Sequence, residues 1–251
     1  MASLTLPTGF GQNATDLDSC FRRCNKLASL TLPTGFGQNA TDIDYCFSGC
    51  GVLTSLTFPA GFGQKATSLD SCFMYCENVT SLAFLDGFGQ NATNLANCFN
   101  YCSKLASMTF PAGFGQKATS LDSCFMYCSS LTSLTFPAGF GQNATNLARC
   151  FGGCSNLTSL SLPTGFGQNA TDLDYCFAIC PELTEITGNP NFKTSVGFSD
   201  STKLTHDSLM VIINGLQTVT ETQTLTLGTD NLAKLSDAEK QIATNKGWTL
   251  A

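Results

Sequence analysis

Hydrophobic and polar positions repeat along this chain with a period of 26 residues. Within one copy, the stretch 53–58 reads LTSLTF, so that Leu53, Leu56 and Phe58 can face a core while the serine and threonine side chains face solvent. This alternation, with its β-branched residues, predicts a short strand. Pro59 ends the strand, because proline has no N–H to donate to a continuing ladder.

The second half of the same copy predicts a turn followed by a short helix. The turn is the stretch 61–63 (GFG), which directs one aromatic ring inward. Thr67 and the acid three residues later, Asp70, have the form of a capping box. Met74 and Tyr75 would point outward from the helix. Its inner face would carry residues spaced i, i+3, i+4 and i+7, which are Leu69, Cys72, Phe73 and Cys76.

This copy is one of seven that fill residues 3–184. Every copy contains Gly-Phe-Gly-Gln, and all 14 cysteines lie in a Cys-Phe-x-x-Cys element, two in each copy. One copy cannot bury enough apolar surface to fold alone, whereas stacked copies cover one another. A period of about 20–29 residues that begins Leu-x-x-Leu-x-Leu is typical of leucine-rich repeats. We therefore predict an α/β leucine-rich repeat solenoid of seven 26-residue repeats, with a parallel β-sheet on one face and short helices on the other.

The start Leu-x-x-Leu-x-Phe/Leu-Pro and the later Phe-x-x-Cys-x-x-Leu resemble the BspA-like, treponemal-type leucine-rich repeat of bacterial surface proteins. The resemblance covers residues 3–184 and holds in both order and spacing. Three features depart from the family pattern. The stretch GFGQNAT is longer than the usual loop, cysteine precedes phenylalanine where the family often has alanine, and the fourth copy has Leu85 and Asp86 in place of proline. The resemblance implies an extracellular or cell-surface location.

Residues 185–251 predict a C-terminal capping region that is continuous with the solenoid. Ile186 lies 26 residues after Leu160 and keeps the strand register. The stretch 188–203 is irregular, with room for one more strand at 195–199. Strands that alternate with longer helices would cover the last coil.

Two helices and one strand are expected in this cap. Thr205 is placed to cap the first helix, and residues 224–227 predict the strand. Ser236 and Glu239 form a second capping box, whose helix should end at Gly247. The apolar face of the first helix would hold Leu209, Ile212, Ile213 and Leu216.

The N-terminal end has no comparable cap in the sequence. Met1 and Ala2 lead directly into the first strand, so that Leu4, Leu6 and Phe10 would lie at an open end of the stack. An open edge of this kind favours association. We therefore expect either a domain of a longer polypeptide or an end-to-end contact.

Composition and charge exclude several classes of partner. Only 12% of residues are charged, and 18 acidic against 12 basic residues give a net charge of −6. The acidic balance argues against binding of nucleic acid. The apolar runs are only a few residues long, which predicts no membrane insertion, and no signal peptide opens the chain.

The paired cysteines admit three interpretations. Cβ atoms at i and i+4 of a helix lie about 5–6 Å apart, and equivalent atoms on neighbouring coils about 4.8 Å apart. A disulfide needs about 3.5–4.5 Å. We expect buried structural thiols, because free cysteine packs as a small apolar residue, while cross-coil disulfides and metal sites stay as alternatives. The cysteines are Cys20, Cys24, Cys46, Cys50, Cys72, Cys76, Cys98, Cys102, Cys124, Cys128, Cys150, Cys154, Cys176 and Cys180.

A row of acids raises the alternative of a calcium ladder. Ala96 and Ala148 interrupt the row, and local capping accounts for the acids, so we expect no metal. The row consists of Asp18, Asp44, Asp70, Asp122 and Asp174.

Seven Asn-x-Thr sequences could carry glycans in a eukaryotic secreted protein. Their repetition favours a part in turns instead. They begin at Asn13, Asn39, Asn78, Asn91, Asn143, Asn156 and Asn169.

The chemical inventory argues against catalysis. His206 is the single histidine and lies beside Asp207 at a predicted helix start, so no second histidine can complete a metal site or a proton relay. The chain has no nucleophile elbow and no phosphate-binding loop. We therefore predict a protein that is not an enzyme, with no catalytic residues, no cofactor and no metal.

The two faces of the predicted solenoid differ in composition. The strand face repeats serine and threonine, whereas the helix face varies and would stack Tyr75, Tyr101 and Tyr127 beside Met74 and Met126. Such residues are typical of interaction hot spots, although exposed apolar residues can also drift without function. The candidate binding surface is Arg22, Arg23, Tyr45, Met74, Tyr75, Tyr101, Met126, Tyr127, Arg149 and Tyr175.

Three functions are consistent with this pattern. The leading hypothesis is a non-enzymatic module for adhesion that binds a protein or a glycan on a rigid scaffold. A second is a building block of an extracellular fibre or phage particle, self-associating through the open N-terminal end. Ice binding by the regular hydroxyl lattice is a remote third.

Overall fold

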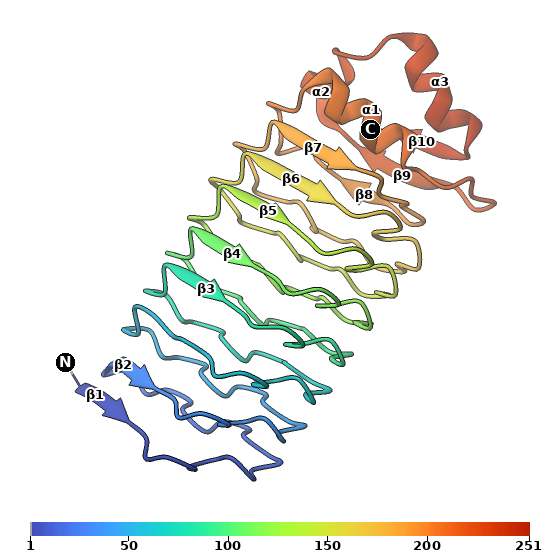
Figure 1. Cartoon of the computed structure of the whole chain (residues 1–251). Coiled ribbons are helices and arrows are strands. Elements are labelled where there is room, and N and C mark those ends of the chain that lie inside the picture. Colours follow the sequence, from blue (N-terminus) through green and yellow to red (C-terminus); the bar gives the residue numbers. More distant parts are fainter. Residues whose placement is uncertain (1) are drawn as a thin grey trace.

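The computed structural model describes residues 2–251, and Met1 lies outside the described part. In Figure 1 the copies form successive coils that stack in one direction, toward a C-terminal part that carries the helices. One side of the stack is formed by β1 (Ala2–Thr5), β2 (Leu27–Thr31), β3 (Ser81–Ala83), β4 (Ser107–Thr109), β5 (Ser133–Thr135), β6 (Ser159–Leu162) and β7 (Glu185–Gly188).

Neighbouring coils pair in parallel at the period of the sequence. Ser81 pairs with Ser107 and Leu134 pairs with Leu160, in each case 26 residues further on. The third copy pairs through the single bridge between Leu30 and Leu56, without a longer strand. This register confirms the predicted leucine-rich repeat solenoid.

The short helices predicted in the repeats are not formed, and this part of the prediction is wrong. Every second N–H of the segment donates to the next coil rather than to its own turn, as Phe73 N does to Cys98 O at 2.8 Å. The N–H groups between them close tight turns three residues back, as Cys76 N does on Phe73 O at 3.1 Å. Since an α-helix needs each N–H for the carbonyl four residues earlier, stacking of the coils replaces the helix.

Left-handed residues accompany these turns. Ser71 has a φ of 55° and Tyr75 a φ of 61°, and the equivalent residues of the other copies are also left-handed. The predicted capping box is likewise absent at Thr67, whose Oγ1 donates to Thr41 O of the preceding coil at 3.2 Å. The inward and outward faces are nevertheless as predicted: Leu69, Cys72, Phe73 and Cys76 are buried, whereas Met74 is half-buried and Tyr75 is exposed.

The core is built from columns of stacked phenylalanine rings. In the column that contains Phe73 and Phe99, the two ring centroids are 5.5 Å apart and the rings are nearly parallel. A second column comes from the Gly-Phe-Gly turns, where Phe88 and Phe114 are 5.9 Å apart. The repeated phenylalanines therefore form two continuous apolar columns along the axis, and each ring packs on its equivalents in the neighbouring coils.

The first coil is less buried than those that follow. Leu4 and Phe10 are exposed, Phe10 to 46%, and Leu6 is half-buried. The expectation of a buried thiol is wrong for Cys20, which is exposed, and Cys24 is half-buried. Within residues 2–251 these side chains have a neighbouring coil on one side only.

The C-terminal part contains the predicted elements and two more. It consists of β8 (Val196–Gly197), α1 (His206–Asn214), β9 (Gln223–Thr226), α2 (Gly228–Leu232), α3 (Asp237–Asn245) and β10 (Trp248–Leu250), with β8, β9 and β10 in one parallel sheet. Thr205 caps α1 and Ser236 forms the capping box of α3, as predicted. The short helix α2 and the strand β10 were not expected. β7 pairs in parallel with β6 in the register of the repeats, so that the strand pairing continues past residue 184. The division of the chain at residue 184 stays a prediction.

Candidate binding surface

Two columns of left-handed residues define one outer surface of the solenoid, which we call the turn face. One column contains Tyr75 and the other contains Ser71, four residues earlier in the same coil. A left-handed backbone costs a non-glycine residue about 1–2 kcal/mol. The side chains of the Tyr75 column reach the surface, whereas the column of Ser71 ranges from buried, at Ser71 and Ser123, to exposed, at Arg149 and Tyr175. The sequence can therefore vary the turn face without changing the coil.

Three adjacent coils of the turn face carry a stack of tyrosines, which we call the tyrosine ladder. The ring centroids of Tyr75 and Tyr101 are 4.9 Å apart, and those of Tyr101 and Tyr127 are 4.6 Å apart. Tyr101 is still 37% exposed. Desolvation, and then the two neighbouring phenols, raise the pKa of Tyr101. Met74 and Met126 lie half-buried beside the ladder.

The remaining candidate residues form two arginine–tyrosine pairs. Arg22 Cζ lies 4.5 Å from the ring centroid of Tyr45, and Arg149 Cζ lies 5.6 Å from that of Tyr175. Arg23 is exposed in the column of the ladder, but Gly49 separates it from Tyr75. The predicted residues thus form a central ladder with one cation–π pair in the coils before it and one in the coils after it.

A hollow of about 290 Å³ adjoins the C-terminal end of the ladder, and we call it the glycine hollow. Gly152 and Gly153 leave its floor without side chains, and Tyr127, Arg149 and Tyr175 surround it. The Tyr127 ring lies against Gly153, where an added Cβ would be only 2.4 Å from Tyr127 Cδ1. The sequence carried a signal for this hollow in the paired glycines, which occur on the turn face of one copy only.

A second hollow, of about 440 Å³, lies where the last turn segment meets β8 and β9, and we call it the junction hollow. Tyr175 lines both hollows. The other walls of the junction hollow carry Asp174, Asp200, Thr224 and Thr226. Sequence reasoning missed this site, because nothing in the strand pattern of the cap indicates that β9 lies opposite Tyr175.

The cysteines lie inside the coils rather than on the binding surface. Within residues 2–251 all of them are free, and every cysteine after Cys24 is buried. Cys102 Sγ donates to Phe73 O of the preceding coil at 3.2 Å, a contact repeated from Cys50 to Cys180. Burial raises the pKa of Cys102 to about 12, so that the thiol stays protonated and unreactive.

The asparagine and aspartate rows also form contacts between coils. Asn143 Nδ2 donates to Gln116 O of the preceding coil at 2.8 Å. Asp44 Oδ1 accepts from Asp70 N at 2.7 Å, and partial burial raises the pKa of Asp44. Among residues 2–251 no cluster of three histidine, cysteine or acidic side chains could hold a metal ion.

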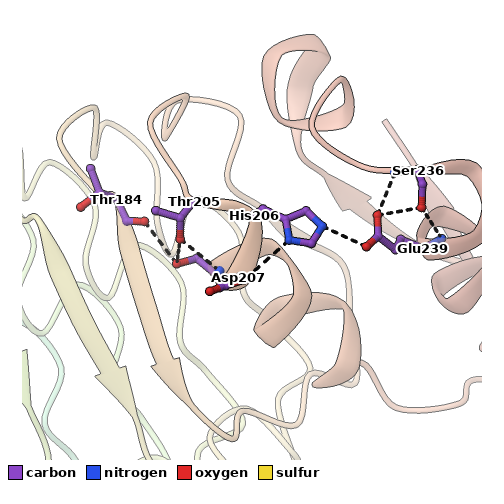
Figure 2. A network of polar contacts seen from close by, with 7 residues as sticks. Thr184, Thr205, His206, Asp207, Ser236 and Glu239 are labelled. Atoms are coloured by element: carbon purple, nitrogen blue, oxygen red, sulfur yellow. Dashed lines mark hydrogen bonds and ion pairs between the residues drawn. The ribbon is translucent and has the colours of Figure 1, made fainter.

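The single histidine takes part in a polar network at the surface of the cap. Figure 2 shows His206 between Asp207 and Glu239, with Ser236 beyond Glu239. His206 Nε2 lies 2.9 Å from Glu239 Oε1, and Ser236 N donates to Glu239 Oε2 at 2.8 Å. The bond to Glu239 raises the pKa of His206, and the bonds from Ser236 lower the pKa of Glu239. Because Glu239 stands between the histidine and the serine, the network joins α1 to α3 and does not activate a nucleophile.

The helices of the cap were also compared with what a membrane-spanning helix requires. None of the helices described in residues 2–251 has the length and apolar character that a membrane span requires.

The fold and its outer columns define a leucine-rich repeat solenoid, and comparison with known proteins identifies which kind. The model of the family described as "BspA type Leucine rich repeat region (6 copies)" matches residues 12–114 and 96–218. The chain therefore belongs to the BspA-type leucine-rich repeat family, as the sequence predicted.

Solved structures with detectable similarity include three bacterial proteins. A leucine rich cell surface protein of Faecalibacterium prausnitzii is 19% identical, with a TM-score of 0.42, over 74% of this chain and 59% of that one. A leucine rich repeat protein of T. pallidum is 15% identical, with a TM-score of 0.42, and the match covers 99% of this chain and 85% of that one. A leucine-rich repeat protein from Bacteroides ovatus is 15% identical, with a TM-score of 0.34, and the match covers 99% of this chain and 83% of that one. The chain thus spans 59% of the F. prausnitzii protein, and no curated protein matches it in sequence.

Proposed function

We propose that this protein is a non-enzymatic adhesion module that binds a protein partner through the turn face. The observation that carries the proposal is the tyrosine ladder, in which three outward-pointing rings stack at 4.9 and 4.6 Å on a rigid scaffold. Tyrosine, methionine and arginine are enriched at protein interfaces. All three residue types meet where the ladder adjoins the glycine hollow.

The orientation of the rings favours a protein over a glycan at this surface. A sugar ring stacks on the open face of an aromatic ring, but both faces of Tyr101 are covered by Tyr75 and Tyr127. What the ladder offers to solvent is ring edges and hydroxyl groups, next to Met74 and Met126. Such a surface suits the apolar and polar side chains of a protein partner.

The scaffold lowers the cost of binding. The backbone of each coil is bonded to the next on the turn face, as Tyr75 N is to Asn100 O and Tyr101 N is to Met126 O, both at 2.8 Å. The tyrosines are therefore held in their stacked positions before a partner arrives, and little further side-chain entropy is lost on association. The arginine–tyrosine pairs before and after the ladder favour a partner with carboxylates at both ends of its contact surface.

We place this activity at the bacterial cell surface. The F. prausnitzii relative is described as a cell surface protein, and the family membership supports the same location for this chain. Attachment to an extracellular or host protein is then the expected use of the turn face.

The test is a binding screen of the full chain against immobilised matrix proteins and a glycan array. We expect a protein ligand whose binding Tyr101→Ala and Tyr127→Ala weaken about tenfold or more, as loss of a hot-spot residue does. Ser107→Ala is the matched control, because Ser107 lies exposed on β4 of the strand face. Binding that both tyrosine variants leave unchanged, or a glycan ligand bound by the ladder, would overturn the proposal.

Pairwise association through the first coil is a second candidate. Its support is the exposed apolar surface of Leu4 and Phe10. The opposite end of the stack is covered by α1, which packs against β7, so that head-to-tail growth has no second open end among the described residues. Light scattering over a range of concentrations should then show dimers rather than fibres, and Phe10→Ser should shift them to monomers. A monomer at every concentration would exclude this candidate.

A further inference from the structure

The junction hollow differs in chemistry from the rest of the surface. It lies on the C-terminal side of Tyr175, at the meeting point of the last turn segment with β8 and β9, and measures about 440 Å³. The glycine hollow on the other side is formed mainly by aromatic, aliphatic and glycine residues. The junction hollow instead combines apolar residues with carboxylates and hydroxyl groups, among them Asp174, Asp200 and the β9 threonines.

Tyr175 supplies an aromatic surface that the tyrosine ladder lacks. Arg149 lies over its ring on the side of the preceding coil, yet the residue is 66% exposed. Tyr175 lines both hollows. Within residues 2–251 no aromatic ring stacks on Tyr175, so that much of this exposed residue is available to a ligand in the junction hollow.

The polar groups around this ring are held in place by the fold. Asp200 Oδ2 accepts from Ile179 N at 2.8 Å, which fixes the carboxylate, and no residue among 2–251 donates to its second oxygen. Thr224 and Thr226 are two residues apart on β9 and thus project from the same face of the strand. Ser195 Oγ accepts from Thr224 N at 3.0 Å, which ties the loop before β8 to β9.

An aromatic ring bordered by fixed carboxylates and hydroxyls is the chemistry that recognises a sugar. The C–H groups on one face of a pyranose pack on the ring, and its hydroxyls donate to carboxylates and exchange bonds with threonine and serine. Asp174 and Asp200 would repel an acidic sugar in the same place. We infer that the junction hollow is a saccharide-binding site for one neutral hexose unit, stacked on Tyr175 and hydrogen-bonded to Asp200 and the β9 threonines. This site shares Tyr175 with the C-terminal end of the protein-binding surface but includes none of the three ladder tyrosines.

The test uses the full chain and a panel of free sugars. Saturation-transfer NMR and calorimetry are run with glucose, galactose, mannose, N-acetylglucosamine and N-acetylgalactosamine, and with glucuronate as the acidic comparison. We expect at least one neutral sugar to bind and glucuronate to bind more weakly. Tyr175→Ala should weaken binding about tenfold or more, while Tyr175→Phe should retain it because the ring face is kept.

Two further variants separate this inference from the proposed function. Asp200→Asn should weaken sugar binding, whereas Tyr101→Ala, which acts on the ladder, should leave it unchanged. Tyr175 is largely exposed, so its variants should fold, and unfolding midpoints check this. The inference is overturned if no neutral sugar binds, if glucuronate binds more tightly, or if Tyr175→Ala has no effect. None of these results bears on protein binding by Tyr101 and Tyr127.

Discussion

Phe140 occupies the space that a side chain on Gly115 would need. A Cβ atom built on Gly115 would lie 2.5 Å from Phe140 Cδ2, and Gly115 also has a φ of +65°. The equivalent pairing recurs along the stack, as in Gly63 against Phe88. Each Gly-Phe-Gly turn is thus shaped by the phenylalanine of the next coil, which links the glycine of one copy to the ring of another.

This relationship predicts that Gly115→Ala destabilises the protein. The left-handed backbone and the displaced ring together should cost about 2–4 kcal/mol. Urea denaturation of the purified variant measures the loss. Gly51→Ala is the matched control, because Gly51 is not left-handed and an added Cβ would meet Tyr75 O at 3.6 Å; it should change stability by less than about 0.5 kcal/mol. Equal effects of the two variants would contradict the packing described here.

The buried thiols should be inert until the chain unfolds. Cys20 is exposed and Cys24 is half-buried. Partial burial raises the pKa of Cys20, and fuller burial raises the pKa of Cys50 and of Cys180 to about 12. A thiol reagent at pH 8 should therefore label Cys20, and more slowly Cys24, in the native protein. In denaturant all 14 cysteines of the sequence should react. Rapid labelling of further thiols without denaturant would show that the coils open.

The His206–Glu239 contact should make stability depend on pH. Since the pKa of His206 is raised above its ordinary 6.5, its contribution is fully present below pH 6.5 and is lost as the pH rises through the raised value. The pKa of Glu239 is lowered from 4.5, so its contribution is present above pH 4.5 and is lost as the pH falls through the lowered value. The pair should therefore stabilise the cap most between these two ordinary values.

Thermal unfolding of the wild type and of His206→Gln from pH 4 to pH 9 measures this dependence. The difference in melting temperature should be largest near pH 5–6 and should decline toward pH 9. Ser236 and its capping box are retained in the variant, so that α3 should stay folded. A difference that grows with rising pH would contradict the contact.

Ile179 should be replaceable with a gain in stability. It has a φ of 56°, which a β-branched side chain disfavours, and it is 54% exposed, so little burial is lost on substitution. Ile179→Asn should stabilise by about 0.5–1 kcal/mol, because asparagine tolerates the left-handed region. Val52→Asn is the control: Val52 is also exposed and β-branched but is not left-handed, and no gain is expected there. A similar gain at both positions would point to a cause other than backbone conformation.

Much of the fold follows from the sequence because its two strongest signals are local and repeated. The spacing of Leu53, Leu56 and Phe58 predicted which side chains are buried, and all three are. In the cap, Thr205 and Ser236 predicted the starts of α1 and α3, because a capping side chain bonds within its own first turn. The boundaries of β9 were displaced by one residue.

The candidate site was predictable in part. The stack of Tyr75, Tyr101 and Tyr127 followed from the period, since equivalent residues must lie above one another in any solenoid. The open face of Tyr175 and its polar surroundings did not follow, because Asp200, Thr224 and Thr226 lie outside the repeats. Their approach to Tyr175 depends on how the cap folds back on the last coil.

By itself, the sequence determined the period, the inward and outward positions of each coil and the family. Only the tertiary structure decided the conformation of the turn segment and the position of the two hollows. The physical reason is that the backbone N–H groups of residues such as Phe73 and Tyr75 could donate to a carbonyl of their own turn or to one of the next coil, and they donate to the next coil. The second carbonyl comes within reach only once the coils are stacked, so no local pattern of side chains can report it.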